Sequence, residues 1–155
     1  MFARTVLSAH RLRDDRWLQD ELEYLWATFF ADTPRVNTVR IEFAGPWKIR
    51  LGVISLSRDS TTTFIGINSL LRYPEVPYYI ASITVAHELV HYAHGFGSPL
   101  PRRYPYPHRG GIVERELRQR GLEAELLLYK EWIDEHWFPF YARKIAQGSS
   151  QRIPA

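Results

Sequence analysis

One segment constrains this chain more than any other part of its sequence. Residues 78–86 carry no charge, and the pattern His-Glu-x-x-His follows directly at residues 87–91. Pro77 before this segment and Gly95 after it are typical of the two ends of a helix. Apolar residues recur at steps of three and four, as on one face of a helix: Ile83, Ala86, Val90 and Ala93. The sequence therefore predicts a core helix over about residues 77–94.

The two histidines of this pattern have the spacing of a metal site. Residues four apart lie one above the other on a helix, so His87 and His91 can direct imidazole nitrogens at one ion. Glu88 lies between them and can reach a water molecule at that ion as a general base. The chain contains no cysteine, so only histidine and carboxylate ligands are available. The pattern predicts a zinc site of the kind found in hydrolases, with Glu88 as the catalytic residue.

A catalytic zinc ion usually has three protein ligands, so one more must come from outside the pattern. His94 shares the helical face, but a helix rises about 1.5 Å per residue, which places it too far along the axis from His87. We expect His94 to lie beside the ligands or in the cleft without binding the ion. His108 stands in a loop rich in proline and glycine, just before the next predicted helix. It is the preferred third ligand.

The rival ligands are acidic residues of that next helix: Glu114, Glu116, Glu123 and Glu125. They alternate with arginines, a pattern typical of a solvated helix face with salt bridges. Glu114 and Glu116 stay open as alternatives to His108, because a gluzincin-type site would use a glutamate from this helix.

The remaining segments predict an α+β domain around the metal helix. Residues 14–30 have leucines at helical spacing, with one of two aspartates at their start as the N-cap. Three further segments predict a short antiparallel or mixed sheet whose first two strands form a hairpin: residues 36–43, 47–56 and 61–67. Residues 111–141 predict one or two closing helices, interrupted near Gly121 and Pro139.

The length and composition agree with a single domain over residues 1–155. A chain of 155 residues, 45% of them hydrophobic, can bury one core. We expect that core within residues 14–141 and a mobile polar tail at residues 147–155. Residues 1–13 lack the apolar centre of a secretory signal, and no apolar run reaches the roughly 20 residues of a membrane span. The sequence thus predicts a cytoplasmic protein without a membrane segment.

Four segments together resemble the SprT-like zinc metallopeptidases and the related minigluzincins: Leu51-Gly52, Ile65 to Leu71, Val76-Pro77 and His87 to His91. The resemblance covers roughly residues 35–120 and implies a small zincin-like domain, in which a short sheet precedes the HExxH helix. It also implies a zinc cofactor and the cleavage of peptide bonds in a protein or peptide substrate. SprT-like members have a third histidine ligand just before a later helix, and His108 occupies the matching place. One departure is the sequence Pro-His-Arg-Gly-Gly around it, where the family has a Gly-His-Gly-like entry.

A zincin-like plan also implies where a substrate would bind. The strand before the metal helix, here residues 62–67, would border the cleft and pair with an extended peptide. The candidates for stabilising a developing oxyanion are Tyr104, Tyr106, His94 and the arginines of residues 102–109. The loop from Gly95 to Gly111 could close over the cleft as a lid or act as a rigid connector.

The charge of the chain leaves a second class of partner open. The net charge is +3, and Arg102, Arg103 and Arg109 alternate with tyrosines that can stack on bases. Nucleic acid is therefore a candidate partner, and a solvated basic rim is the plainer interpretation. Two alternatives to a general peptidase follow: a regulatory protease with a single partner protein, and a non-catalytic nucleic-acid-binding domain with a structural zinc ion. Glu88 argues against the second, because a structural zinc site needs no base.

Overall fold

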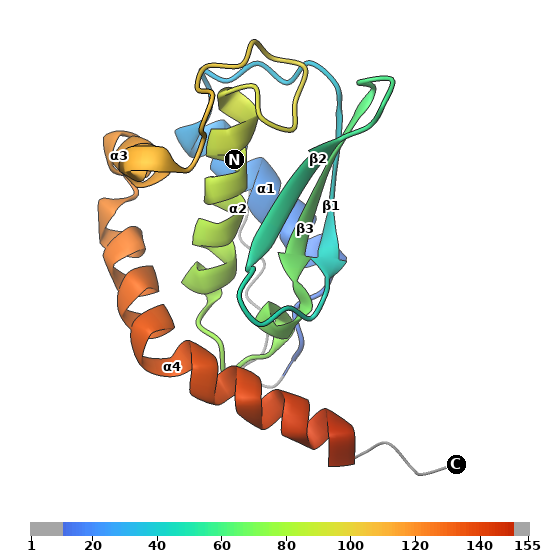
Figure 1. The fold of residues 1–155 in the computed structure, drawn as a ribbon, viewed down its shortest axis with the longest axis vertical. Coiled ribbons are helices and arrows are strands. Elements are labelled where there is room, and N and C mark those ends of the chain that lie inside the picture. The colour runs from blue at the N-terminus through green and yellow to red at the C-terminus, as the bar shows by residue number, and fades with distance from the viewer. Residues whose placement is uncertain (1–10, 151–155) are drawn as a thin grey trace.

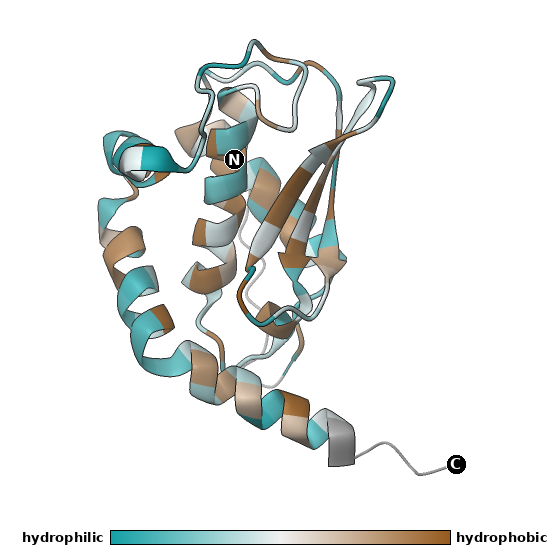
Figure 2. Cartoon of the chain, viewed as in Figure 1, coloured by the Kyte–Doolittle hydropathy of each residue, from teal (hydrophilic) through white to brown (hydrophobic). Residues whose placement is uncertain are grey.

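Helix α2 (Tyr78–Ala93) forms the centre of the molecule, with the sheet on one side and the C-terminal helices on the other (Figure 1). The computed structural model describes residues 11–150, so the expectations about residues 1–10 and 151–155 lie outside the described residues. Most of α2 is buried, as its uncharged sequence permits, and its bounds confirm the helix predicted over residues 77–94. Figure 2 shows apolar residues along α2 and the strands and mainly hydrophilic residues along α3 (Ile112–Gln119).

Helix α1 (Asp15–Phe29) begins where the sequence predicts it. The Asp14 carboxylate accepts a hydrogen bond from the Trp17 amide at 2.8 Å, which satisfies one of the free N–H groups at the helix start. The leucine stripe of α1 is completely buried. The buried Glu21 carboxylate accepts a hydrogen bond from Ser82 Oγ of α2 at 2.6 Å. These contacts fix α1 against α2.

The sheet is mixed and has three strands, β1 (Thr38–Ala44), β2 (Gly52–Leu56) and β3 (Thr62–Asn68). Their order is β1-β3-β2, with β3 parallel to β1 and antiparallel to β2. The expected hairpin between the first two strands is therefore wrong. β3 takes the central place because it has the most buried side chains, Ile65 and Ile67 among them, and a central strand is the most shielded.

The central place of β3 also corrects the expected substrate strand. Both sides of β3 are paired, so residues 62–67 have no free row of backbone groups with which to bind a peptide. β1 and β2 are the two edge strands, and β2 is the one nearest to α2 in Figure 1. Any strand addition beside α2 would therefore use β2.

The segment between β1 and β2 crosses the end of β3 and does not form the early part of the predicted second strand. The side chain of buried Asn68 donates hydrogen bonds to the carbonyl oxygens of Trp47 and Arg50 at 2.7 and 2.9 Å. Trp137 Nε1 donates to the carbonyl oxygen of Lys48 at 2.7 Å. Three side-chain hydrogen bonds thus hold this irregular segment in place.

The C-terminal helices α3 and α4 (Glu123–Ser150) cover the other side of α2. Gly121, at a φ of 93°, separates them as predicted. Pro139 does not end a helix, because α4 continues through it and bends along its length (Figure 1). The predicted helix end near Tyr141 is therefore wrong, and the start of the predicted tail is helical. Neither α4 nor any other described helix combines the length and apolarity needed to cross a membrane.

Candidate metal centre

Three histidines from two parts of the chain meet beside α2. His87 and His91 lie one turn apart on the helix, with their Nε2 atoms 3.1 Å apart. His108, just before the short helix η2 (Arg109–Gly111), brings its ring centroid to 4.5 Å from that of His91. One ligand nitrogen from each ring lies within 4.8 Å of the other two. The structure thus brings together the three residues that the sequence analysis selected as ligands.

The three histidines fit a metal ion. Nitrogens bound at about 2.0–2.1 Å to a tetrahedral ion lie about 3.3 Å apart, close to the observed separation of the Nε2 atoms of His87 and His91. Burial lowers the pKa of His87 to about 4 and that of His91 to about 3, and the neighbouring histidines act in the same direction. Both rings are therefore neutral at neutral pH, and each can offer a nitrogen lone pair to a cation.

Glu88 lies on the same helix and faces a cleft between α2 and β2. Its side chain is buried, and this burial raises the pKa of Glu88 to about 8, although the charge of Arg50 lowers it. Gly52 of β2 leaves the space that the carboxylate occupies. A β-carbon at Gly52 would lie 2.8 Å from Glu88 Oε1 and 2.8 Å from Thr84 Cγ2. Only glycine allows the backbone of β2 to approach α2 this closely.

The cleft in front of the histidines has a volume of about 940 Å³. β2 and the segment before it form one wall, and α2 with α4 forms the other. Apolar side chains dominate the lining, and they come from both walls: Trp47, Ile49, Ile54, Phe64, Phe96 and Ile133. Because β2 is an edge strand, the cleft offers apolar surface and unpaired backbone groups to an extended chain.

Tyr129 of α4 also lines the cleft. Burial raises the pKa of Tyr129 to about 12; a hydrogen bond with Thr84 opposes this shift and the charge of Glu88 adds to it. The phenol is therefore protonated at neutral pH and can donate a hydrogen bond. Its place in the apolar stripe of a helix predicts a core residue only, so sequence periodicity did not identify it as part of the site.

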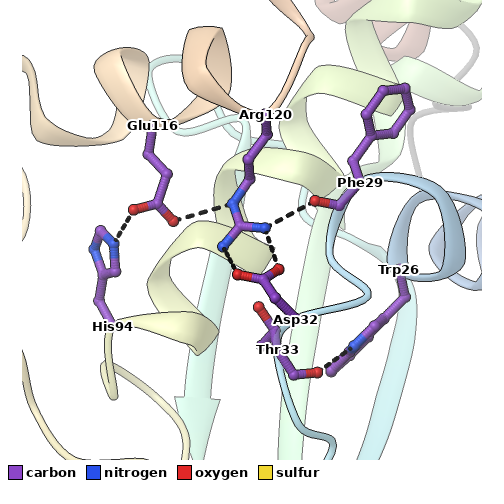
Figure 3. Close-up of polar contacts among 7 residues, drawn as sticks. All are labelled: Trp26, Phe29, Asp32, Thr33, His94, Glu116 and Arg120. Atoms are coloured by element: carbon purple, nitrogen blue, oxygen red, sulfur yellow. Dashed lines mark hydrogen bonds and ion pairs between the residues drawn. The ribbon is translucent and has the colours of Figure 1, made fainter.

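His94 belongs to a polar network that joins α1, α2 and α3 (Figure 3). The Glu116 carboxylate lies 2.7 Å from His94 Nε2 and accepts a hydrogen bond from Arg120 Nε at 3.2 Å. Arg120 also donates to Asp32 at 2.7 Å and to the carbonyl oxygen of Phe29 at 2.8 Å. His94 is not one of the three clustered histidines, as expected, and of its two expected places the cleft is wrong. The network instead ties the end of α2 to α3, the helix that follows His108.

The rival ligands lie in ion pairs on α3. Glu114 accepts a hydrogen bond from Lys130 Nζ at 2.9 Å and lies 3.5 Å from Arg118. Glu116 is engaged by His94 and Arg120. Among the described residues, neither glutamate belongs to the group that could hold a metal ion. The expected salt-bridged character of this helix is confirmed.

The three histidines and Glu88 define the site from the coordinates of this chain. The chain matches no protein-family model, no curated protein and no solved structure. No relative therefore assigns a family or a reaction, and the chemistry is inferred from the residues of the cleft.

The loop between α2 and His108 is fixed by its own contacts. The Phe96 amide donates to the carbonyl oxygen of His91 at 2.9 Å, and the Arg103 amide donates to that of His94 at 2.8 Å. Gly95 has a φ of 73°, and a β-carbon there would overlap the carbonyl oxygens of the returning chain. Of the two roles expected for this loop, these contacts favour the rigid connector.

The arginines and tyrosines of this loop lie outside the cleft. Arg102 donates to the carbonyl oxygens of Tyr104 and Pro105 at 3.1 and 3.0 Å, and the Arg109 guanidinium lies 4.3 Å from the ring centre of Tyr106. None of the expected oxyanion-stabilising residues lines the cleft. Contact with nucleic acid through these arginines stays a prediction.

Three residues of the cleft have little or no signal in the sequence. An isolated glycine in a strand pattern, such as Gly52, indicates a close approach of another element. Tyr129 and Arg50 have no local signal, because a tyrosine in a helix stripe and an arginine in a turn are ordinary features of any fold. Only the packing of α4 and β2 around α2 identifies them.

Proposed function

We propose that this protein is a zinc-dependent peptidase of the HExxH type. The observation that carries the proposal is the position of Glu88, whose carboxylate faces an apolar cleft beside three clustered histidines. A structural zinc site is closed by four protein ligands, whereas three histidines leave one position open. Zinc suits three imidazole ligands, and the absence of cysteine leaves no thiolate to form a closed site. The resemblance of the sequence to SprT-like metallopeptidases supports the same reaction class.

The chain's own residues would divide the chemistry of hydrolysis. His87, His91 and His108 would hold the zinc ion, which when bound polarises a carbonyl group and lowers the pKa of water. Glu88, whose pKa the positive charge of the bound ion would bring below its metal-free value of about 8 so that the carboxylate is ionised, would accept the proton of the attacking water and return it to the leaving amine. Tyr129 would donate a hydrogen bond to the oxygen on which negative charge develops. No covalent bond would form between the chain and its substrate.

The substrate would bind in an extended conformation. The unpaired edge of β2 can pair with a peptide backbone, and the apolar walls can receive alternate side chains. A folded protein presents few free extended segments, so loops and unfolded regions would be cleaved first.

Metal analysis and proteolysis of the purified protein test the proposal together. We expect about one zinc ion per chain and zinc-dependent cleavage of casein, an unfolded protein. Glu88→Gln should keep the zinc ion and the fold while it abolishes cleavage, because an amide cannot accept the proton of water. A parallel assay with a DNA-bound protein as substrate tests whether nucleic acid directs the reaction.

A matched control distinguishes the loss of the proposed general base from the loss of a negative charge elsewhere on the protein. Glu131→Gln removes an exposed carboxylate from α4, outside the cleft lining, and should leave cleavage unchanged. Full activity of Glu88→Gln would refute Glu88 as the base. Stoichiometric zinc without cleavage of any peptide would favour a non-catalytic zinc domain.

A further inference from the structure

Arg50 lies in the cleft wall just before β2, two residues from Gly52. Its side chain is exposed and its guanidinium makes no hydrogen bond or ion pair with the described part of the chain. Its charge nevertheless acts on Glu88, whose pKa it lowers. An arginine of this kind has five unused donors in a fixed planar arrangement.

The backbone beneath this side chain is held firmly. The carbonyl oxygen of Arg50 accepts a hydrogen bond from Asn68, and the neighbouring Lys48 and Trp47 carbonyl oxygens accept bonds from Trp137 and Asn68. The guanidinium is therefore attached to a fixed point of the cleft wall. Only its side-chain torsions need to be ordered when a ligand binds, which keeps the entropic cost of binding low.

The other groups of the cleft make this charge distinctive. Most of the lining is apolar, and its three histidines are the residues that would hold the metal ion. Arg50 is the only arginine or lysine among the described residues that line the cleft. Its planar guanidinium can hold a carboxylate of a bound peptide with two parallel hydrogen bonds.

We propose that Arg50 selects substrates that carry a carboxylate one to two residues from the bond that is cleaved. This inference rests on the proposed peptidase function. Gly52 lies directly against Glu88, so the cleaved bond would lie beside Gly52. Arg50 lies two residues before Gly52 in the irregular segment, and two residues span at most about 7 Å. An extended substrate advances about 3.3 Å per residue, so Arg50 would lie within reach of a side chain one to two residues from the reacting carbonyl group. The carboxylate can be an acidic side chain or the C-terminus of the peptide.

A peptide set distinguishes these two sources. Eight-residue apolar peptides carry a single Glu at each position in turn, with Gln counterparts, and each is made with a free or an amidated C-terminus. Cleavage rates and cleavage positions are measured by mass spectrometry on the zinc-loaded protein. We expect the preferred Glu position to raise kcat/KM about tenfold over Gln, with the cut one to two residues away. If only the free C-terminus has this effect, the C-terminal carboxylate is the group that Arg50 binds.

Variants assign the preference to one side chain. Arg50→Gln should remove the difference between Glu and Gln peptides, and Arg50→Glu should reverse it in favour of Lys at the same position. Lys48→Gln removes the same charge from the same segment, but its side chain does not line the cleft, so the preference should persist. Equal rates for Glu and Gln peptides in the unmodified protein, or a preference unchanged in Arg50→Gln, overturn the proposal.

A binding measurement keeps this test separate from the proposed function. Calorimetry on zinc-loaded Glu88→Gln, with and without Arg50→Gln, compares the affinities of the Glu and Gln peptides without any hydrolysis. Tighter binding of the Glu peptide that disappears with Arg50→Gln supports the selectivity even if no peptide is cleaved. Equal affinities overturn it even if cleavage is observed.

Discussion

Gly52 of β2 and Glu88 of α2 pack so closely that a β-carbon on the glycine would lie 2.8 Å from the carboxylate oxygen. This contact sets the direction of the carboxylate from the opposite wall of the cleft. A residue without chemistry of its own therefore determines where the proposed general base lies.

Gly52→Ala should displace Glu88 and slow peptide cleavage about a hundredfold, the typical effect of moving a catalytic group by about 1 Å. Zinc content should remain unchanged, because the atoms nearest to a β-carbon at Gly52 belong to Glu88 and Thr84 and not to the three histidines. Steady-state kinetics and metal analysis check the two expectations. A variant with normal kcat and bound zinc would show that the carboxylate position is not restricted by β2.

His108→Ala should weaken zinc binding severely and leave the fold intact. His108 is exposed and contributes little to the core, yet its ring centroid lies 4.5 Å from that of His91. With two histidines left, the ion loses one of three protein ligands. Competition with a chelator measures the affinity, and circular dichroism controls for folding. His136→Ala on α4, also exposed, is the matched control and should bind zinc normally. Unchanged affinity in His108→Ala would exclude it as a ligand.

Tyr129→Phe should lower kcat by about ten- to a hundredfold with little change in KM, because its hydroxyl would act on the transition state more than on the bound substrate. The ring and its packing remain, so stability should change little. Kinetics of the pure variant decide the point. A rise in KM alone would instead indicate that Tyr129 contacts the bound substrate.

The stability of the metal-free protein should fall as the pH rises from about 6.5 to about 8. Burial raises the pKa of Glu88 from 4.5 to about 8, so in this range the folded state holds a proton that the unfolded state has released. Below about 6.5 the lowered pKa values of His87 and His91 act in the opposite direction. Each pKa unit corresponds to about 1.4 kcal/mol, so the loss is about 2 kcal/mol. Glu88→Gln should not show this loss, so its stability relative to that of the unmodified protein should increase as the pH rises. Urea unfolding at several pH values in the presence of EDTA measures the free energy of unfolding of both proteins. The same pH dependence in both would contradict the prediction.

Glu116→Ala should destabilise the fold by about 1–3 kcal/mol, because it leaves His94 and Arg120 without their shared partner. His94 is 1% exposed and its other ring nitrogen already lacks a partner among the described residues, so water cannot replace the carboxylate easily. Glu131→Ala, at an exposed position, should have almost no effect. Urea denaturation compares the variants. If the two behave alike, the network contributes nothing to stability.

The sequence by itself determined helix α2 and the turn of it that carries His87, Glu88 and His91. Helical periodicity is a local property, so a spacing of four residues, an uncharged run and its flanking proline and glycine predict the geometry without reference to the rest of the chain. An aspartate cap at the start of α1, which the structure assigns to Asp14, and the break at Gly121 were predicted for the same reason.

Only the tertiary structure decided which strand is central and which faces the cleft. Alternation of apolar residues predicts that a segment is a strand but not which strand lies beside it, so the pairing of β3 with both β1 and β2 could not be read from the pattern. The helical extent of α4 beyond Pro139 likewise depends on packing, since a proline can be accommodated by a bend. Gly52 and Tyr129 come from elements far apart in the sequence. Their meeting at Glu88 depends on how β2 and α4 pack against α2, which no local pattern encodes.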